Sequence, residues 1–204
     1  RHSEGSALRA PEVLRRADHL GDYGYVESVQ YCPCEPGELS DFYQNAGRLL
    51  ALLHALMATD CHHENLIAVG NQLVLVDAET LLMGTSADEV KVSTRFEAAD
   101  ALEPGSVLRV GMLPSWVWLG GRRLAIDASA LGVAPSNGQQ QGSGWRAINT
   151  DSMIRGYVRV PVAQPTSLPT LSGAPDPAEN QTVADHVEDI VTGFIDAYRV
   201  LLDG

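Results

Sequence analysis

The chain has 204 residues, 45% of them hydrophobic, which is enough to form one hydrophobic core and fits a single domain or a large part of one. It carries 14 basic and 26 acidic side chains, a formal net charge of -12, which argues against nucleic acid as a partner. The absence of a signal-like or membrane-spanning apolar segment and the odd number of cysteines lead us to expect a reduced, cytoplasmic protein with no membrane partner.

The first predicted elements are a strand and a helix. Aromatic and β-branched residues are frequent over residues 23–32 and predict a strand after a turn at Gly21 and Asp22. From Ser40 onward, apolar residues recur at the spacing of an amphipathic helix with one face toward a core. The residues of this stripe are Phe42, Ala46, Leu49, Leu50, Leu53, Leu56 and Met57.

A β-hairpin is predicted next. Residues 66–69 and 73–76 form two short β-prone runs, and the turn between them includes Gly70 and Asn71. Farther along the chain, residues 134–144 are rich in Gly and Gln and predict a flexible loop, and the proline-rich residues 161–177 predict a second one.

The last predicted element is a C-terminal helix. Asp176, Pro177 and Glu179 have the layout of an N-cap, a proline at the first helical position and an acid at the third. Apolar residues at helical spacing follow and predict that the helix buries one face. They are Val183, Val187, Ile190, Val191, Phe194, Ile195, Tyr198, Leu201 and Leu202.

A polar cluster lies between the first helix and the hairpin. Asn65 follows Asp60 by five positions, and Asp77 follows Asn65 by twelve. Protein kinases have a similar order: a catalytic-loop Asp, an Asn, and a later Asp that holds Mg²⁺. Asn65 and Asp77 stand at the two ends of the hairpin, so their oxygens can converge on one ion. Asp60 or His62 can then receive or orient the proton of the attacking hydroxyl group.

The pattern Asp-x-His-x-x-Asn, then a hairpin, then Asp, resembles the catalytic loop of lipid kinases. Further matching segments are GDYGYVE, GRLLALLHALMATDCHHENLIAVGNQLVLVDAETLL, SVLRVGMLP, DASALG, INTDSM and GFIDAY, in that order along the chain. Together they resemble the dehydratase domain of class II (LanM-type) lanthipeptide synthetases. The likeness extends over most of the chain, and its longest block is specific.

The resemblance implies an enzyme that phosphorylates Ser and Thr of a ribosomally made precursor peptide with ATP and Mg²⁺, and then eliminates the phosphate to leave dehydroamino acids. It implies an α+β fold: the larger lobe of a lipid- or protein-kinase-like domain, with a catalytic-loop hairpin between helices. The residues that match the family's kinase-site motif are Asp60, His62, Asn65, Asp77 and Glu79, with Asn65 and Asp77 as metal ligands.

The resemblance also implies that residues 1–204 are the central part of one such domain, truncated at both ends. The family's nucleotide-contacting Lys is expected before this segment, and the Arg and Thr linked to phosphate elimination are expected after it. A zinc-dependent cyclase domain is expected toward the C-terminus of the parent chain. We therefore expect the isolated segment to be inactive.

Three other interpretations fit parts of the pattern. Cys32, Cys34, Cys61, His62 and His63 could supply soft ligands to zinc, although their spacing is not that of a recurrent structural zinc site. Another lipid-kinase-like or small-molecule phosphotransferase would share the metal-site spacing. A non-catalytic relative that binds peptides would be expected to lack the cluster's acids or its Asn, and this chain has them all.

Overall fold

The computed structural model describes residues 17–19, 21–82, 105–118, 125–127, 129–132, 139–147, 149–161, 166–173 and 183–203. These residues form a mixed α+β structure in which each strand pairs with one neighbour in an antiparallel two-stranded sheet. The elements are β1 (Ala17–His19), β2 (Gly24–Val26), η1 (Pro36–Glu38), α1 (Leu39–Ala55), β3 (Leu66–Val69), β4 (Gln72–Leu75), η2 (Val107–Val110), β5 (Trp116–Trp118), β6 (Ala125–Asp127), β7 (Gln139–Arg146), β8 (Ile154–Pro161), η4 (Val183–His186) and α3 (Val187–Asp203).

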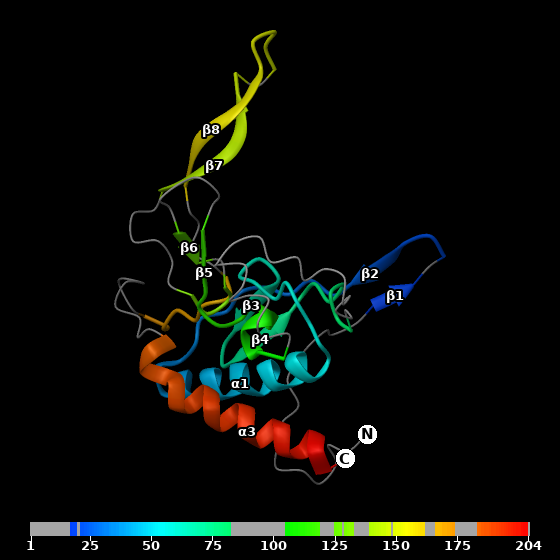
Figure 1. Cartoon of the computed structure of the whole chain (residues 1–204), viewed down its shortest axis with the longest axis vertical. Helices are drawn as coiled ribbons and strands as arrows, with labels where there is room; N and C mark the ends of the chain where they lie inside the picture. The colour runs from blue at the N-terminus through cyan, green and yellow to red at the C-terminus, as the bar shows by residue number, and fades with distance from the viewer. Residues whose placement is uncertain are drawn as a thin grey trace.

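Helix α1 is the centre of the core. The β3–β4 hairpin packs along one side of it, and α3 crosses its other side (Figure 1). The predicted helix from Ser40 is confirmed, and most of its apolar stripe is buried. The fully buried large side chains of α1 are Phe42, Tyr43, Leu49 and Leu53, and they meet Leu66, Leu73 and Leu75 of the hairpin in one hydrophobic cluster.

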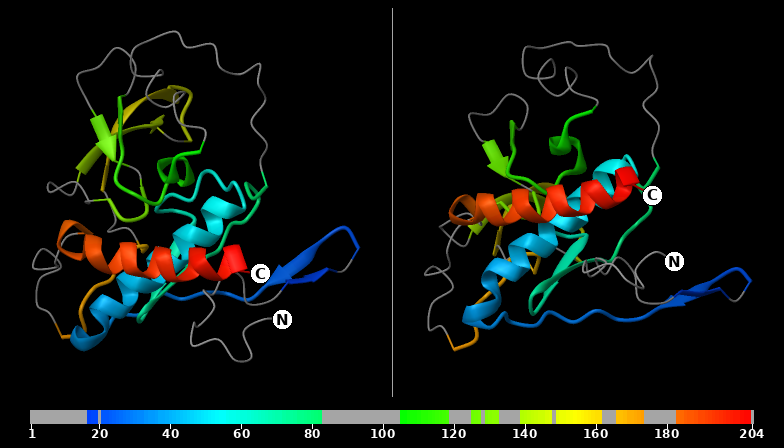
Figure 2. Two further views of the ribbon diagram at one scale, coloured as in Figure 1. Left: turned by 60° about the horizontal axis from the view of Figure 1, so that its bottom comes forward. Right: turned by 90° about the horizontal axis from the view of Figure 1, so that it is seen from below.

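Helices α1 and α3 cross each other (Figure 2). Their backbones meet at two glycines, Gly47 of α1 and Gly193 of α3. A β-carbon added at Gly47 would overlap the carbonyl oxygen of Ile190, and one added at Gly193 would overlap the carbonyl oxygen of Gln44. The backbones therefore touch at this crossing, and any side chain larger than hydrogen would force the helices apart.

The predicted hairpin is confirmed. Leu66 lies opposite Leu75 and Val69 opposite Gln72, so β4 begins one residue earlier than predicted. Gly70 occupies the turn with a φ of 58°, a left-handed conformation that glycine adopts without steric cost. The described helices include none long and apolar enough to cross a membrane.

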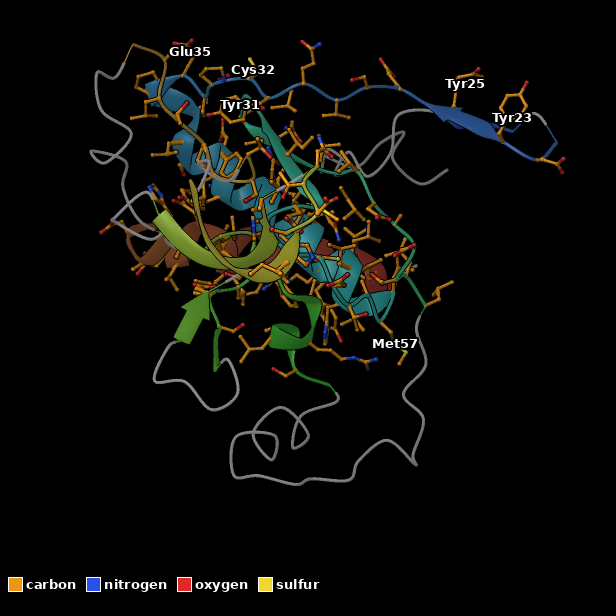
Figure 3. All side chains as sticks on the ribbon, turned by 90° about the horizontal axis from the view of Figure 1, so that it is seen from above. Tyr23, Tyr25, Tyr31, Cys32, Glu35 and Met57 are labelled. Atoms are coloured by element: carbon orange, nitrogen blue, oxygen red, sulfur yellow. The ribbon has the colours of Figure 1, made fainter. Side chains whose placement is uncertain are left out.

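The outer edge of β3 is extended by two further segments. Cys32 forms a parallel bridge with Val69, and Cys34 forms one with Leu171. The predicted strand over residues 23–32 is confirmed only in part, because β2 ends at Val26. Figure 3 shows Tyr23 and Tyr25 on an arm that projects from the body, whereas Tyr31 and Cys32 lie against it.

One of the two loop predictions was wrong. Residues 139–144, expected to be a flexible loop, belong to strand β7, which pairs with β8 over its whole length. Backbone pairing outweighs the low strand propensity of glycine there. In the proline-rich segment, Pro161 ends β8, and residues 166–173 run beside β3 and residues 32–34, where Thr166 O accepts a hydrogen bond from Ala68 N (2.6 Å). Residues 134–138, 162–165 and 174–177 lie outside the described residues.

The predicted C-terminal helix is confirmed over residues 187–203, and its predicted start at Asp176 lies outside the described residues. The prediction that its apolar stripe is buried was wrong for most positions. Ile190 and Gly193 are buried against α1. The exposed residues of the predicted stripe are Val187, Val191, Ile195, Tyr198, Leu201 and Leu202. The cause is geometric: a single neighbouring helix covers only a narrow strip of a helix surface.

Candidate active site

The end of α1 directs the chain into the polar cluster. Met57 N donates to His54 O (3.0 Å) and Ala58 N donates to Leu53 O (2.9 Å), and Met57 has a φ of 53°. This pairing is a Schellman motif with Met57 in the left-handed position. Met57 lies at the opposite end of α1 from Glu35 (Figure 3). The motif reverses the chain, so the polar cluster begins at a fixed point beside the helix end.

Two hydrogen bonds close the cluster into a ring, which we call the closed loop: residues 59–65 and residues 76–80. At one end Val76 N donates to Asn65 O (2.9 Å), which continues the β3–β4 pairing by one step. At the other end the hydroxyl group of Thr80 donates to Thr59 O. All five predicted site residues lie in this loop, although Asp60 and Glu79 are separated by nineteen positions of sequence.

Asp60 and His62 are in direct contact. His62 Nε2 lies 3.3 Å from Asp60 Oδ1. His62 Nδ1 accepts a hydrogen bond from Glu64 N (3.2 Å), so in the neutral ring the proton is on Nε2, which donates to Asp60. Asp60 has a φ of 61°, which is uncommon for a residue with a side chain. Its side chain remains 56% exposed, so the contact with His62 leaves the carboxylate open to solvent.

Asn65 is fixed in one orientation. Its backbone N donates to His62 O (3.1 Å), and its side-chain Nδ2 donates to Asp60 O (2.8 Å). Because Nδ2 must face a carbonyl group, the amide cannot flip, and Oδ1 is the outward atom. Within the described part of the chain, Oδ1 accepts no hydrogen bond. An amide oxygen of this kind is a suitable ligand for Mg²⁺.

Asp77 and Glu79 form a turn on the other half of the closed loop. Asp77 Oδ1 accepts a hydrogen bond from Glu79 N (3.2 Å), an Asx-turn, and both side chains are exposed. Asp77 follows the residue that pairs with Asn65, so the backbone brings it next to Asn65. The structure thus joins Asp60, His62 and Asn65 by direct contacts, and it joins Asp77 to them through backbone pairing alone.

The zinc interpretation was wrong. The described residues contain no group of three or more His, Cys, Asp or Glu side chains that could hold a metal ion. All three cysteines are free, Cys32 being exposed and the other two buried. Burial is the main cause that raises the pKa of Cys34 to about 11, with a smaller contribution from the charge of Glu38. Burial likewise raises the pKa of Cys61 to about 11, with a smaller contribution from the charge of Asp60. Cys34 and Cys61 are therefore neutral, buried thiols at neutral pH.

Two segments support the closed loop from outside, and sequence reasoning assigned them no role. Cys61 N donates to Val110 O (2.9 Å), and His62 forms an antiparallel bridge with Ser129. Residues 110–112 and 129–131 are also hydrogen-bonded to each other. These segments fall within the stretches SVLRVGMLP and DASALG, so the resemblance to the family was the only sequence signal that pointed to them.

Comparisons with known proteins show the family to which the chain belongs. The family described as a domain of unknown function (DUF4135) matches residues 1–204. The chain belongs to the DUF4135 family. This DUF4135 chain is also 33% identical over 94 residues to the lacticin 481/lactococcin biosynthesis protein LcnDR2 of Lactococcus lactis subsp. lactis, a match that covers 45% of the chain and 10% of that relative. The resemblance to LanM-type synthetases is thereby confirmed.

Proposed function

We propose that the chain carries the phosphoryl-transfer centre of a lanthipeptide dehydratase, which phosphorylates Ser and Thr of a precursor peptide with ATP and then eliminates the phosphate. The relative whose name refers to lacticin 481 biosynthesis supports lanthipeptide modification. The observation that carries the phosphoryl-transfer step is the closed loop, which gathers Asp60, His62 and Asn65 beside the Asp77 turn. We also propose that this chain is the core of a kinase-like larger lobe.

Asp60 is the proposed proton acceptor. Its exposed carboxylate takes the proton of the peptide hydroxyl as that oxygen attacks the γ-phosphorus of ATP, and ADP leaves with the electrons of the broken bond. His62 is the positioning group. By donating from Nε2 to Asp60 Oδ1, it limits the rotation of the carboxylate and keeps the other oxygen available to the substrate.

Asn65 and Asp77 are the proposed ligands of Mg²⁺. Both offer hard oxygen atoms, the fixed Oδ1 of Asn65 and the carboxylate of Asp77, and such donors fit the ion. A bound Mg²⁺ would neutralise charge on the phosphates, which matters for a chain of net charge -12 because its own field repels ATP. Glu79 is tied to Asp77 by its backbone amide and has a supporting role in this site.

The test uses the full-length protein that carries this chain, a precursor peptide, ATP and Mg²⁺, with mass spectrometry of the peptide. We expect phosphorylated and dehydrated peptide from the wild type and neither from Asp77→Ala. Asp41→Ala is the control, because Asp41 is an exposed acid on α1 outside the closed loop, and it should retain activity. Formation of ADP without modified peptide would favour a small-molecule phosphotransferase. Full activity of Asp77→Ala would overturn the metal assignment.

A further inference from the structure

Asp127 binds the amide of Ser129, the residue that is bridged to His62 of the closed loop. It has no role in the proposed mechanism. It is the last residue of β6, and its Oδ1 accepts hydrogen bonds from two backbone amides, Ser129 N at 3.0 Å and Ser115 N at 3.4 Å. A carboxylate that accepts two amide N–H groups holds both chain segments more firmly than a neutral acceptor would. The Asp127 carboxylate therefore holds the backbone amides of residues 115 and 129 close to each other.

Gly132 packs against the same carboxylate. A β-carbon at this position would lie 2.6 Å from Asp127 Oδ1 and closer still to Oδ2. Its φ is not in the left-handed region, so the effect of a methyl group there would be to displace the Asp127 carboxylate from its two amide partners and not to strain the backbone. The Asp127 carboxylate is thus enclosed by the amides of Ser115 and Ser129 and by the backbone of Gly132.

Residues 129–132 are connected to the catalytic residues. Ser129 forms the antiparallel bridge with His62 and is buried, with 7% of its surface exposed. Ala130 N donates to Gly111 O (3.2 Å) and Leu131 N donates to Met112 O (2.9 Å), so residues 129–131 are held on a second side as well. Asp60 has a left-handed φ, which is unfavourable for a residue with a side chain unless the surrounding chain holds it. The bridge between Ser129 and His62 lies two residues from Asp60 and can help to hold this conformation.

We propose that Asp127 is a positioning residue for the Asp60–His62 pair: its carboxylate fixes residues 129–132, and through Ser129 these residues fix the backbone of His62. The proposal rests on the proposed function for its consequence in catalysis, but the structural link can be tested alone. Removal of the carboxylate should loosen residues 59–65 and leave the distant parts of α1 unchanged.

The first measurement is hydrogen–deuterium exchange by mass spectrometry on the full-length protein. We expect peptides over residues 59–65 to exchange faster in Asp127→Ala than in the wild type, with no change over residues 39–50. Asp127→Asn should exchange at a rate between those of the wild type and Asp127→Ala, because the amide oxygen can still accept both N–H groups but carries no charge. Asp151→Ala is the control, since Asp151 is an exposed acid in the β7–β8 connection. Unchanged exchange over residues 59–65 in Asp127→Ala would overturn the proposal.

The second measurement is a double-mutant cycle on peptide phosphorylation. We expect Asp127→Ala to lower kcat roughly tenfold or more, as outer partners of catalytic groups commonly do, with little change in the KM for ATP. Gly132→Ala should lower kcat too, but add nothing in the Asp127→Ala background, because the carboxylate it would overlap is gone. Additive effects would overturn the proposal. If the exchange result holds while the wild type phosphorylates no peptide, the proposed function fails and the structural link stands.

Discussion

The hydroxyl group of Thr80 donates a hydrogen bond to the carbonyl oxygen of Thr59. Thr59 directly precedes Asp60, and Thr80 directly follows Glu79, so one contact holds the two acid-bearing segments together. This hydrogen bond closes one end of the closed loop, and the hydrogen bond from Val76 N to Asn65 O closes the other end. Leu82 N also donates to Leu56 O (2.8 Å), and of these two contacts the Thr80 hydrogen bond is the one next to Asp60 and Glu79.

Thr80→Val should therefore weaken catalysis more than stability. Valine keeps the shape and removes the donor, so we expect a loss of about 1 kcal/mol in the free energy of unfolding, the usual net value of one hydrogen bond. The kcat for peptide phosphorylation should fall roughly tenfold, because the Asp77 turn would no longer be held against Asp60. Urea unfolding and steady-state kinetics measure the two effects. Thr80→Ser keeps the hydroxyl and should restore both, and a failure to do so would contradict this role.

The helix crossing predicts a large effect of a single methyl group. Gly193→Ala gains about 1 kcal/mol in helix propensity, but its methyl group would overlap the carbonyl oxygen of Gln44. Backbone atoms cannot move aside as a flexible side chain can, so the clash should outweigh the gain in helix propensity. We expect the free energy of unfolding to fall by about 1–3 kcal/mol. Gly37→Ala is the matched control, since nothing lies within 4 Å of its added β-carbon, and it should be nearly neutral. Thermal unfolding of both variants checks the comparison.

Stability should depend on pH in the acid range through Asp189 at the start of α3. Burial raises the pKa of this carboxyl group, but hydrogen bonds from Ser40 (2.6 Å), His186 (2.8 Å) and Gln44 outweigh burial, and the net pKa is lowered. The unfolded chain then binds the proton first as pH falls. The stabilisation is complete above the ordinary pKa of about 3.9 and is lost as pH falls through the folded-state value.

The check is urea unfolding of the wild type and of Asp189→Asn at a series of acid pH values. The variant should be less stable near neutral pH and should lose less stability on acidification. Parallel curves for the two proteins would mean that another carboxyl group is responsible.

Cysteine reactivity should distinguish the three thiols. Cys32 is exposed, whereas the buried Cys34 and Cys61 have pKa values of about 11 and would be thiolates in only about one molecule in a thousand at about pH 8. Iodoacetamide should modify one cysteine quickly in the native protein and all three in denaturant. Cys32→Ser should abolish the fast reaction, and rapid labelling of a second native thiol would show that the core opens readily.

Local patterns in the sequence predicted α1, the β3–β4 hairpin and the helical part of α3. Each prediction relied on apolar spacing or turn residues within one short segment, and the spacing of Asp60, Asn65 and Asp77 was visible in the same way. Strand β7 was missed because its glycines and glutamines have little strand propensity, and it forms by pairing with β8.

The sequence by itself determined which segments become helices or hairpins and which polar residues flank them. Only the tertiary structure decided that Gly193 meets α1 while Val191 and Ile195 remain exposed, that Thr80 returns to Thr59, and that Asp127 binds the amide of Ser129, which is bridged to His62. The reason is that periodicity reports the conformation of neighbouring residues. Contacts between residues tens of positions apart depend on the path of the whole chain, which no short segment encodes.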